Sequence, residues 1–405
     1  MSPTDQPSSE PRAASRRAFL ALSGTATATA LAGCNALRGD EPAAFAGGDW
    51  LTYGNGPTNS NRVDGGLPAP DDHAVVAPAD WPYAPPVVHG GVVYFATGRD
   101  ALAIAADGGE QWSRRLDGEV SGAPAVDPAR ERLYVPVRVV PTTDGPDPAS
   151  VTVLSLADGA VRDTFRVGDD AAYGATVDGG DVYVRSASAC VRLAPDGTER
   201  WRRSLDPLVY DEFNLGDSTA TQIAPAVGPD GVYVPDRNAL VKLDPATGEE
   251  RWRVAVGSPY AASVVDDGGV VQTGWQETVA ATTAGEVRWR RDLHSRAAAA
   301  VGDGAVYVAA HDLHELDAGT GETNWQAHLP SEGTAAPVAT DESVLAASSG
   351  VRAFRKDASG VLSPDRERWQ TSSIAATAYS SPVVAAGRVF VVGAYGLLSL
   401  RSGED

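Results

Sequence analysis

Cysteine is scarce in this sequence of 405 residues, which contains only Cys34 and Cys190. Cys34 lies near the N-terminus in a segment that we interpret below as an export signal, so one cysteine remains for the folded part. That excludes a disulfide framework within the chain, even in an oxidising compartment. Cys190 lies in the strand-like segment SASACVRLAP. We expect it to be a small buried hydrophobic residue.

Lysine is nearly absent. Only Lys242 and Lys356 are lysines among 33 basic residues, whereas 53 acidic residues bring the net charge to −20. Such a surface repels phosphate backbones, so nucleic acid is excluded as a partner. Carboxylates bind hydration water and cations, and this composition predicts a halophilic source. The charge therefore says little about any specific partner.

A long hydrophobic run is also missing. The mildly apolar stretch 18–33 is rich in Thr and Gly, and it is too short to span a membrane as a helix. It follows Arg16 and Arg17 and runs into LAGC at 31–34, which resembles a twin-arginine export signal ending in a lipobox. We expect a signal over residues 1–34 with lipid on Cys34, a flexible tether over 35–49, and anchoring to the extracytoplasmic face of the cell membrane. An uncleaved anchor and an unrelated cysteine are the alternatives.

The chain is rich in turn-forming residues, with 43 Gly and 28 Pro, and it repeats itself. The segment LDPATGEERW at 243–252 returns as LDAGTGETNW at 316–325. A period of roughly forty residues with short β-rich runs predicts the blades of a β-propeller. Eight repeat starts are found: PPVVHGGVVYFATG (85–98), APAVDPARERLYVPV (123–137), GATVDGGDVYVRS (174–186), APAVGPDGVYVPD (224–236), ASVVDDGGVVQTG (262–274), AAAVGDGAVYVAA (298–310), APVATDESVLAAS (336–348) and SPVVAAGRVFVVG (381–393).

The repeated motif predicts how neighbouring blades are joined. In KLDPATGEERW, Thr247 and Gly248 form a turn that needs a positive φ, and Trp252 offers a flat apolar surface to the next blade. Further copies of the motif end at Trp112, Trp201, Trp289 and Trp369, and Phe165 takes this place in the second blade. We expect all these aromatic residues to be core residues.

The segments KLDPATGEERW and ELDAGTGETNW resemble the tryptophan-docking repeat of the pyrroloquinoline-quinone-type (PQQ-like) β-propellers. The resemblance covers roughly residues 50–402 and implies an all-β, eight-bladed propeller over residues 50–405. This superfamily includes quinoprotein dehydrogenases. It also includes cofactor-free binding propellers, such as the lipoprotein of the outer-membrane β-barrel assembly machinery.

The last repeat ends at Leu400 without a fourth strand. The segment HAVVAPADWPYAPPVV at 73–88 has the spacing of ERWRVAVGSPYAASVV at 250–265, which contains a fourth strand. We therefore predict that residues 73–80 close the ring beside the C-terminal strands, which hides the sheet edges.

Candidate binding residues lie in the loops that surround one mouth of a propeller, where strand four returns to strand one and strand two turns into strand three. An aromatic, partly charged mouth favours a peptide or a small amphipathic ligand. Trp275 stands out because it matches no docking position. The alternative is that these residues only form turns or separate the blades. The candidates are Tyr83, Arg99, Tyr210, Asp211, Arg237, Tyr260, Trp275, His311 and Tyr379.

Catalytic and metal motifs are not found in the sequence. His311 and His314 are three residues apart at a turn entering a strand, so their side chains should point in opposite directions. The acids at 211, 212 and 217 do not have the spacing of an EF-hand loop, and no G-x-S-x-G elbow or P-loop occurs. We expect no metal site and no catalytic residue.

Two functions remain open. Resemblance to the quinoprotein dehydrogenases implies a vicinal cysteine pair, a Trp beneath the quinone, calcium ligands and an Asp base. This sequence has no cysteine pair and lacks the long insertions of those enzymes. We therefore expect a monomeric, non-catalytic protein-binding or scaffold module without PQQ, whose partners are exported or membrane proteins. A PQQ-dependent dehydrogenase-like oxidoreductase is the alternative.

Overall fold

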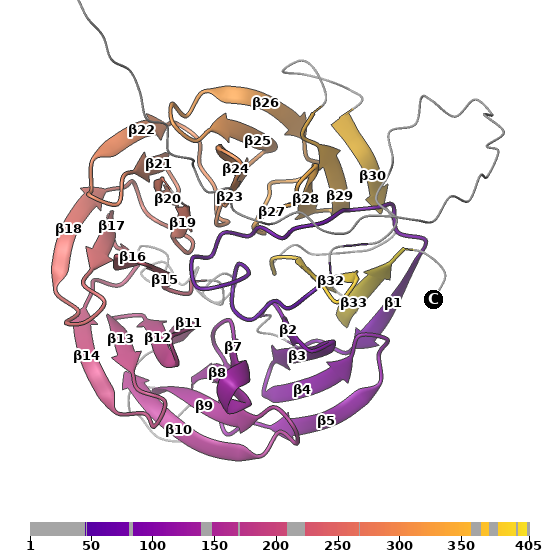
Figure 1. Cartoon of the computed structure of the whole chain (residues 1–405), viewed down its shortest axis with the longest axis vertical. Coiled ribbons are helices and arrows are strands. Elements are labelled where there is room, and N and C mark those ends of the chain that lie inside the picture. Colours follow the sequence, from indigo (N-terminus) through magenta and orange to yellow (C-terminus); the bar gives the residue numbers. More distant parts are fainter. Residues whose placement is uncertain are drawn as a thin grey trace, which may run out of the picture. The chain divides into compact units, whose positions relative to one another are not determined.

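The computed structural model describes residues 45, 47–80, 84–138, 148–168, 171–208, 223–266, 268–357, 366–371, 380–393 and 396–402. The chain divides into two units, Met1–Asp40 and Glu41–Asp405, and all described residues belong to the second. In that unit eight antiparallel sheets follow one another around a ring (Figure 1). The predicted all-β, eight-bladed propeller is confirmed.

The blades follow the chain, and each runs outward from a short inner strand. Blade 1 contains β2 (Val87–His89), β3 (Val92–Thr97), β4 (Asp100–Ala105) and β5 (Glu110–Arg115). Blade 2 contains β7 (Ala125–Asp127), β8 (Arg132–Arg138), β9 (Ala149–Ser155) and β10 (Val161–Gly168), with β6 (Glu119–Val120) beside β8 and the 3₁₀ helix η1 (Pro128–Arg130) after β7. Blade 3 contains β11 (Ala172–Asp178), β12 (Asp181–Ser186), β13 (Ala189–Leu193) and β14 (Glu199–Ser204). Blade 4 contains β15 (Ala226–Gly228), β16 (Gly231–Asp236), β17 (Ala239–Leu243) and β18 (Glu250–Ala255).

The second half repeats this plan. Blade 5 contains β19 (Val264–Asp266), β20 (Gly269–Thr273), β21 (Thr278–Ala281) and β22 (Val287–Arg291). Blade 6 contains β23 (Ala300–Gly302), β24 (Ala305–Ala309), β25 (Asp312–Asp317) and β26 (Thr323–His328). Blade 7 contains β27 (Val338–Ala339), β28 (Ser343–Ser348), β29 (Gly350–Arg355) and β30 (Glu367–Thr371). Blade 8 contains β31 (Val383–Ala385), β32 (Arg388–Gly393), β33 (Gly396–Arg401) and β1 (Asp72–Ala77).

Closure of the ring joins the two ends of the propeller. β1 pairs antiparallel with β33 and forms the outer strand of blade 8. The guanidinium of Arg401 lies 2.8 Å from the carboxylate of Asp72 across this pair. The predicted closure is confirmed, and the strand ends at Ala77.

Among the described residues, the repeated motif fastens blades 2 to 6 each to the blade before it. Gly248 of blade 4 has φ 72°, and a Cβ added there would lie 2.7 Å from the ring of Trp201 in blade 3. The indole Nε1 of Trp201 donates to the carbonyl of Pro245, 2.9 Å away, in the same turn. A glycine therefore lets the turn lie flat on the indole. The same glycine-to-aromatic contact pairs Gly159 with Trp112, Gly197 with Phe165, Gly285 with Trp252, and Gly321 with Trp289.

Residues 48–67 form a segment along the axis that the repeat pattern did not reveal. We name it the axial segment, and in Figure 1 it crosses the middle of the ring as an indigo trace. Its carbonyls accept backbone hydrogen bonds from inner strands around the ring, at 2.7–3.1 Å. The pairs are Gly48 with Ala386, Trp50 with Val88, Leu51 with Val126, Pro57 with Val227, Thr58 with Val265, Ser60 with Val301, and Asn61 with Ala339.

The axial segment begins inside the stretch expected to be a tether. Phe45 is 3% exposed and lies edge-on to Trp369 with 6.4 Å between ring centroids. The carbonyl of Gly48 accepts a hydrogen bond from the backbone N–H of Ala386 in blade 8. Phe45 and Gly48 both belong to the stretch 35–49, and both contact the propeller. The packed unit therefore starts before residue 50.

The two ends of the ring differ. We call the end with the strand-two-to-three turns and the blade-to-blade connections the mouth, and the opposite end the base. Arg62 of the axial segment pairs with Asp303 at 2.9 Å and with Asp341 at 3.3 Å. Both acids lie in turns between the first and second strands of their blades. This part of the axial segment therefore lies at the base.

Candidate binding site at the mouth

The structure places only some of the residues proposed from the sequence. Arg16, Arg17, Cys34, Tyr83, Tyr210, Asp211 and Tyr379 lie outside the described residues. Arg99 donates to the carbonyl of Asp117, 2.7 Å away in the connection from blade 1 to blade 2. Arg237 lies in the β16–β17 turn. Tyr260, Trp275 and His311 come from different loops, and the structure brings them to one place.

Trp275 is held by two loops that bond to each other. It lies between β20 and β21, and its backbone N–H donates to the carbonyl of Ser258, 2.9 Å away in the loop entering blade 5. Gly274 pairs with Pro259 in the same contact. A Cβ on Gly274 would lie 2.6 Å from the carbonyl oxygen of Gly257, so glycine allows this close approach. The backbone is thus fixed, while the Trp275 side chain remains 44% exposed.

Aromatic and cationic side chains surround Trp275. Its ring centroid lies 6.0 Å from that of Tyr260 and 5.9 Å from that of His294. The guanidinium carbon of Arg296 lies 4.7 Å from the Trp275 centroid, as in a cation–π pair. His294 meets His311 edge-on at 5.4 Å. We name the group formed by Tyr260, Trp275, His294, Arg296, His311 and Glu332 the Trp275 patch.

Glu332 lies beside Arg296 and His294 and comes from the connection between blades 6 and 7. Its Oε1 lies 3.4 Å from Nε2 of His294 and 3.7 Å from Nε of Arg296. These three side chains are 26–35% exposed. The patch therefore offers solvent an indole, a guanidinium and imidazoles on a fixed backbone, which suits an amphipathic segment carrying acidic or carbonyl groups.

Sequence reasoning named Tyr260, Trp275 and His311 but missed His294, Arg296 and Glu332. The missed residues lie in DLHSRAAAA and LPSEGTAAP, in blade-to-blade connections. The tyrosine candidates lie in the same kind of connection. Position in the repeat is therefore the signal that identifies these charged residues.

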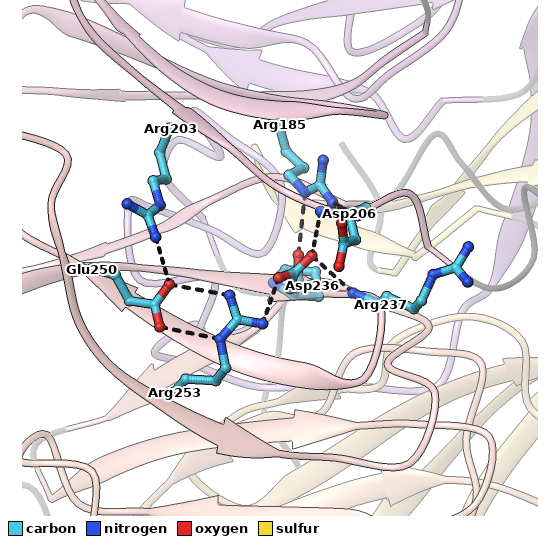
Figure 2. A network of polar contacts seen from close by, with 8 residues as sticks. Arg185, Arg203, Asp206, Asp236, Arg237, Glu250 and Arg253 are labelled. Atoms are coloured by element: carbon cyan, nitrogen blue, oxygen red, sulfur yellow. Dashed lines mark hydrogen bonds and ion pairs between the residues drawn. The ribbon is translucent and has the colours of Figure 1, made fainter.

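A second polar group lies at the mouth of blades 3 and 4, around the buried Asp236 (Figure 2). Its Oδ2 accepts from Nη1 of Arg253 at 2.7 Å, and its Oδ1 accepts from the backbone N–H groups of Asp206 and Arg237 at 2.7 and 3.0 Å. Asp236 is 1% exposed. This carboxylate fixes the backbone of the turn that carries Arg237, so the network is a support for the mouth.

Arginines extend this network on both sides. Arg185, labelled in Figure 2, is fully buried. It donates to the carbonyls of Pro235, Ser186 and Asp206, which lie in blades 3 and 4 and the connection between them. On the outer side, Glu250 accepts from Arg253 and from Arg203 of blade 3. The hydrogen bonds from Arg253 hold the pKa of the Glu250 carboxyl below its usual value. Blades 3 and 4 are therefore joined by bonded charges as well as by the Trp201 contact.

Cys190 is buried and unpaired, as the sequence predicted. Burial raises the pKa of its thiol to about 12, so it stays protonated and unreactive near neutral pH. In the part of the chain that the structure describes, no group of three or more His, Cys, Asp or Glu side chains could hold a metal ion. Those residues also include no helix long and apolar enough to cross a membrane.

Comparisons with known proteins agree with the repeat pattern. Residues 64–189, 190–282 and 275–362 match the family model described as outer membrane protein assembly factor BamB. A comparison with curated proteins found no match.

Solved structures share the fold at low identity. BamB from Moraxella catarrhalis is 14% identical, with a TM-score of 0.61, covering 82% of this chain and 98% of that one. The quinohemoprotein alcohol dehydrogenase of Comamonas testosteroni is 12% identical, with a TM-score of 0.65, covering 88% and 81%. A europium-containing methanol dehydrogenase is 11% identical, with a TM-score of 0.60, covering 85% and 89%. These likenesses show the fold alone, whereas the family model spans most of the propeller, and the chain belongs to the family described as outer membrane protein assembly factor BamB.

Proposed function

We propose that this protein is a non-catalytic scaffold, held outside the cell membrane by lipid on Cys34, that binds segments of exported or membrane proteins as a monomer. The family described as an outer membrane protein assembly factor supports a role among such proteins. We define the partner by its chemistry and not by barrel assembly.

The Trp275 patch carries this proposal. Interfaces gain most of their binding energy from a few aromatic and arginine side chains that become fully desolvated. Trp275 is 44% exposed although the loops beneath it are fixed by backbone bonds, so binding costs little ordering of the protein. Arg296 and the two histidines add donors for carboxylate or carbonyl groups of the partner.

Trp275 is one possible platform for the quinone of the dehydrogenase alternative, and the side chains around it do not fit a quinone. The Arg296 guanidinium lies over the Trp275 ring, and Tyr260 and His294 flank it. The cysteines of the sequence are far apart, at 34 and 190, and Cys190 lies in the core beside Trp201. We therefore propose that the protein uses no quinone cofactor.

Crosslinking on intact cells tests the scaffold function. Wild-type protein should crosslink to a discrete set of exported or membrane proteins, and Trp275→Ala should lose that set without a change in melting temperature. Val287→Ala is the matched control, because Val287 is also exposed, at 43%, but lies on the outer strand β22. An unchanged set with Trp275→Ala, or crosslinks only to random abundant proteins, would refute the proposal.

A further inference from the structure

The second strand of most blades carries an aromatic ring that fills the contact with the next blade. In blade 4, Tyr233 lies opposite Lys242, and Lys242 lies opposite Trp252. The rings of Tyr233 and Trp252 have centroids 5.9 Å apart, and the ammonium of Lys242 lies 5.4 Å from the Tyr233 centroid. The Tyr233 hydroxyl donates to Asp230 at 2.8 Å. Tyr233 and Lys242 thus place two large side chains side by side on neighbouring strands, next to Trp252.

Other blades place an aromatic residue at the same position. Blades 1, 2, 3, 6 and 8 have Tyr94, Tyr134, Tyr183, Tyr307 and Phe390 there. Blade 7 has Leu345 at this position. Blade 5 has the smaller Val271, which lies opposite Ala280, and Ala280 lies opposite Trp289. Both large side chains of blade 4 are therefore replaced by small ones in blade 5. The sequence shows the change as GGVVQT in place of DGVYVP.

A cavity of about 420 Å³ lies where those side chains are missing. Val271 and Ala280 line it, together with Val306 and Ala318 of blade 6. Its walls include the turns at Gly268 and Gly304, so it opens at the base of the ring, away from the Trp275 patch. The volume falls within the range of small-ligand sites, about 300–1,000 Å³.

Charged groups stand at the entrance of this cavity. Arg62 and Arg288 line it along with Asp266 and Asp303. Arg62 is paired with Asp303, whereas Arg288, among the described residues, makes a hydrogen bond only to the carbonyl of Gly268. The entrance therefore has donors and acceptors for a hydroxyl, and the interior is apolar.

We propose that this cavity, the blade 5 pocket, binds a phenol ring. It is the vacated copy of a site that holds a tyrosine in five other blades, so a phenol matches it in shape, and the charged entrance matches the hydroxyl. The inference goes beyond the scaffold function, because the pocket and the Trp275 patch lie at opposite ends of the ring. Free phenols and a tyrosine side chain of a partner share this chemistry.

Ligand-observed NMR with p-cresol and the full chain in high salt tests the pocket. Wild-type protein should bind p-cresol saturably, and toluene at least tenfold more weakly, because toluene lacks the hydroxyl. Val271→Tyr, which restores the ring of the sibling blades, should abolish binding. Trp275→Ala should bind p-cresol like the wild type, which separates this test from that of the scaffold function.

Two further variants test the pocket even if Val271→Tyr does not fold. Ala280→Leu fills the pocket with a smaller change and should weaken binding at least tenfold. Tyr233→Val with Lys242→Ala should open a second pocket in blade 4 and double the number of p-cresol molecules bound. Absence of saturable binding to the wild type, equal binding of toluene, or undiminished binding by folded Val271→Tyr would each overturn the proposal.

N-acetyl-tyrosine amide distinguishes the two sources of the phenol. If both N-acetyl-tyrosine amide and p-cresol bind, and Val271→Tyr abolishes the binding of both, the pocket admits a tyrosine carried on a peptide backbone. If p-cresol alone binds, the pocket takes free phenols. Either result supports the phenol site, and failure of both probes refutes it.

Discussion

Single residues decide how tightly the blades join, and the glycine facing Trp201 is the clearest case. Gly248 combines a positive φ with a Cβ position 2.7 Å from the indole. Gly179 has a positive φ of 58° but nothing within 4 Å of its Cβ position. Substitution of Gly179 therefore tests backbone strain alone, whereas substitution of Gly248 adds steric overlap with the indole.

We expect Gly248→Ala to destabilise the protein more than Gly179→Ala. Alanine in the left-handed region costs about 1–2 kcal/mol at either site. Overpacking against Trp201 adds about 1–3 kcal/mol at residue 248 alone. Urea unfolding of both variants in high salt measures the difference, and equal free energies of unfolding would show that the turn does not press on the indole.

The two cysteines should respond differently to the same substitution. Cys34→Ser should release the protein from membranes or leave it unprocessed, because the lipid would have no thiol to attach to. Cys190→Ser should do neither, since Cys190 is a buried side chain in the core of blades 3 and 4. Fractionation of cells expressing each variant provides the measurement. Processed Cys34→Ser protein that stayed on the membrane would disprove the anchor.

At the scale of elements, the N-terminal part contributes two separate pieces to the propeller, the axial segment and β1. We expect a chain trimmed through residue 43 to melt like the mature protein, because Phe45 is the first described residue that packs. Trimming through residue 69 removes the bonds of the axial segment to the inner strands. Trimming through residue 77 also exposes the edge of β33 and should lower the melting temperature further. Equal midpoints in high salt for the three truncations would contradict both roles.

The sequence predicted the repeated elements well and the unique ones poorly. Eight starts, the closing strand and the docking of Trp112, Phe165, Trp201, Trp252 and Trp289 follow from self-alignment, and the structure confirms them. Trp369 instead contacts Phe45 and donates to the carbonyl of Leu67. The axial segment occurs once, so no second copy could reveal it. Its course depends on left-handed Asn59 and Asn61, with φ 57° and 50°, whose side-chain amides donate to Ala224 and Ala299. Those contacts exist only after the ring has closed.

The sequence predicted which loops surround the mouth of the ring, but it did not predict which of their side chains contact one another. Position in the repeat placed Tyr260, Trp275 and His311 at one end of the ring. Their meeting depends on the angle between blades 5 and 6, which the local sequence does not encode. The contact of Arg296 with the Trp275 ring likewise joins the connection between blades 5 and 6 to the β20–β21 turn of blade 5. Long-range geometry of this kind determines which mouth residues become one surface.

The proposed lack of a quinone cofactor needs a direct test, because the fold is shared with quinohemoprotein and methanol dehydrogenases. A ligand that binds only the folded state raises the free energy of unfolding by about 2.7 kcal/mol when the ligand concentration is a hundred times the dissociation constant. We expect added quinone with calcium to leave the melting temperature unchanged beyond the general salt effect, and alcohols or sugars to give no dye reduction. The docking glycines and aromatic residues, such as Gly248 on Trp201, explain the repeats through packing alone. A saturable, quinone-specific rise in melting temperature that Trp275→Ala abolished would instead favour a dehydrogenase.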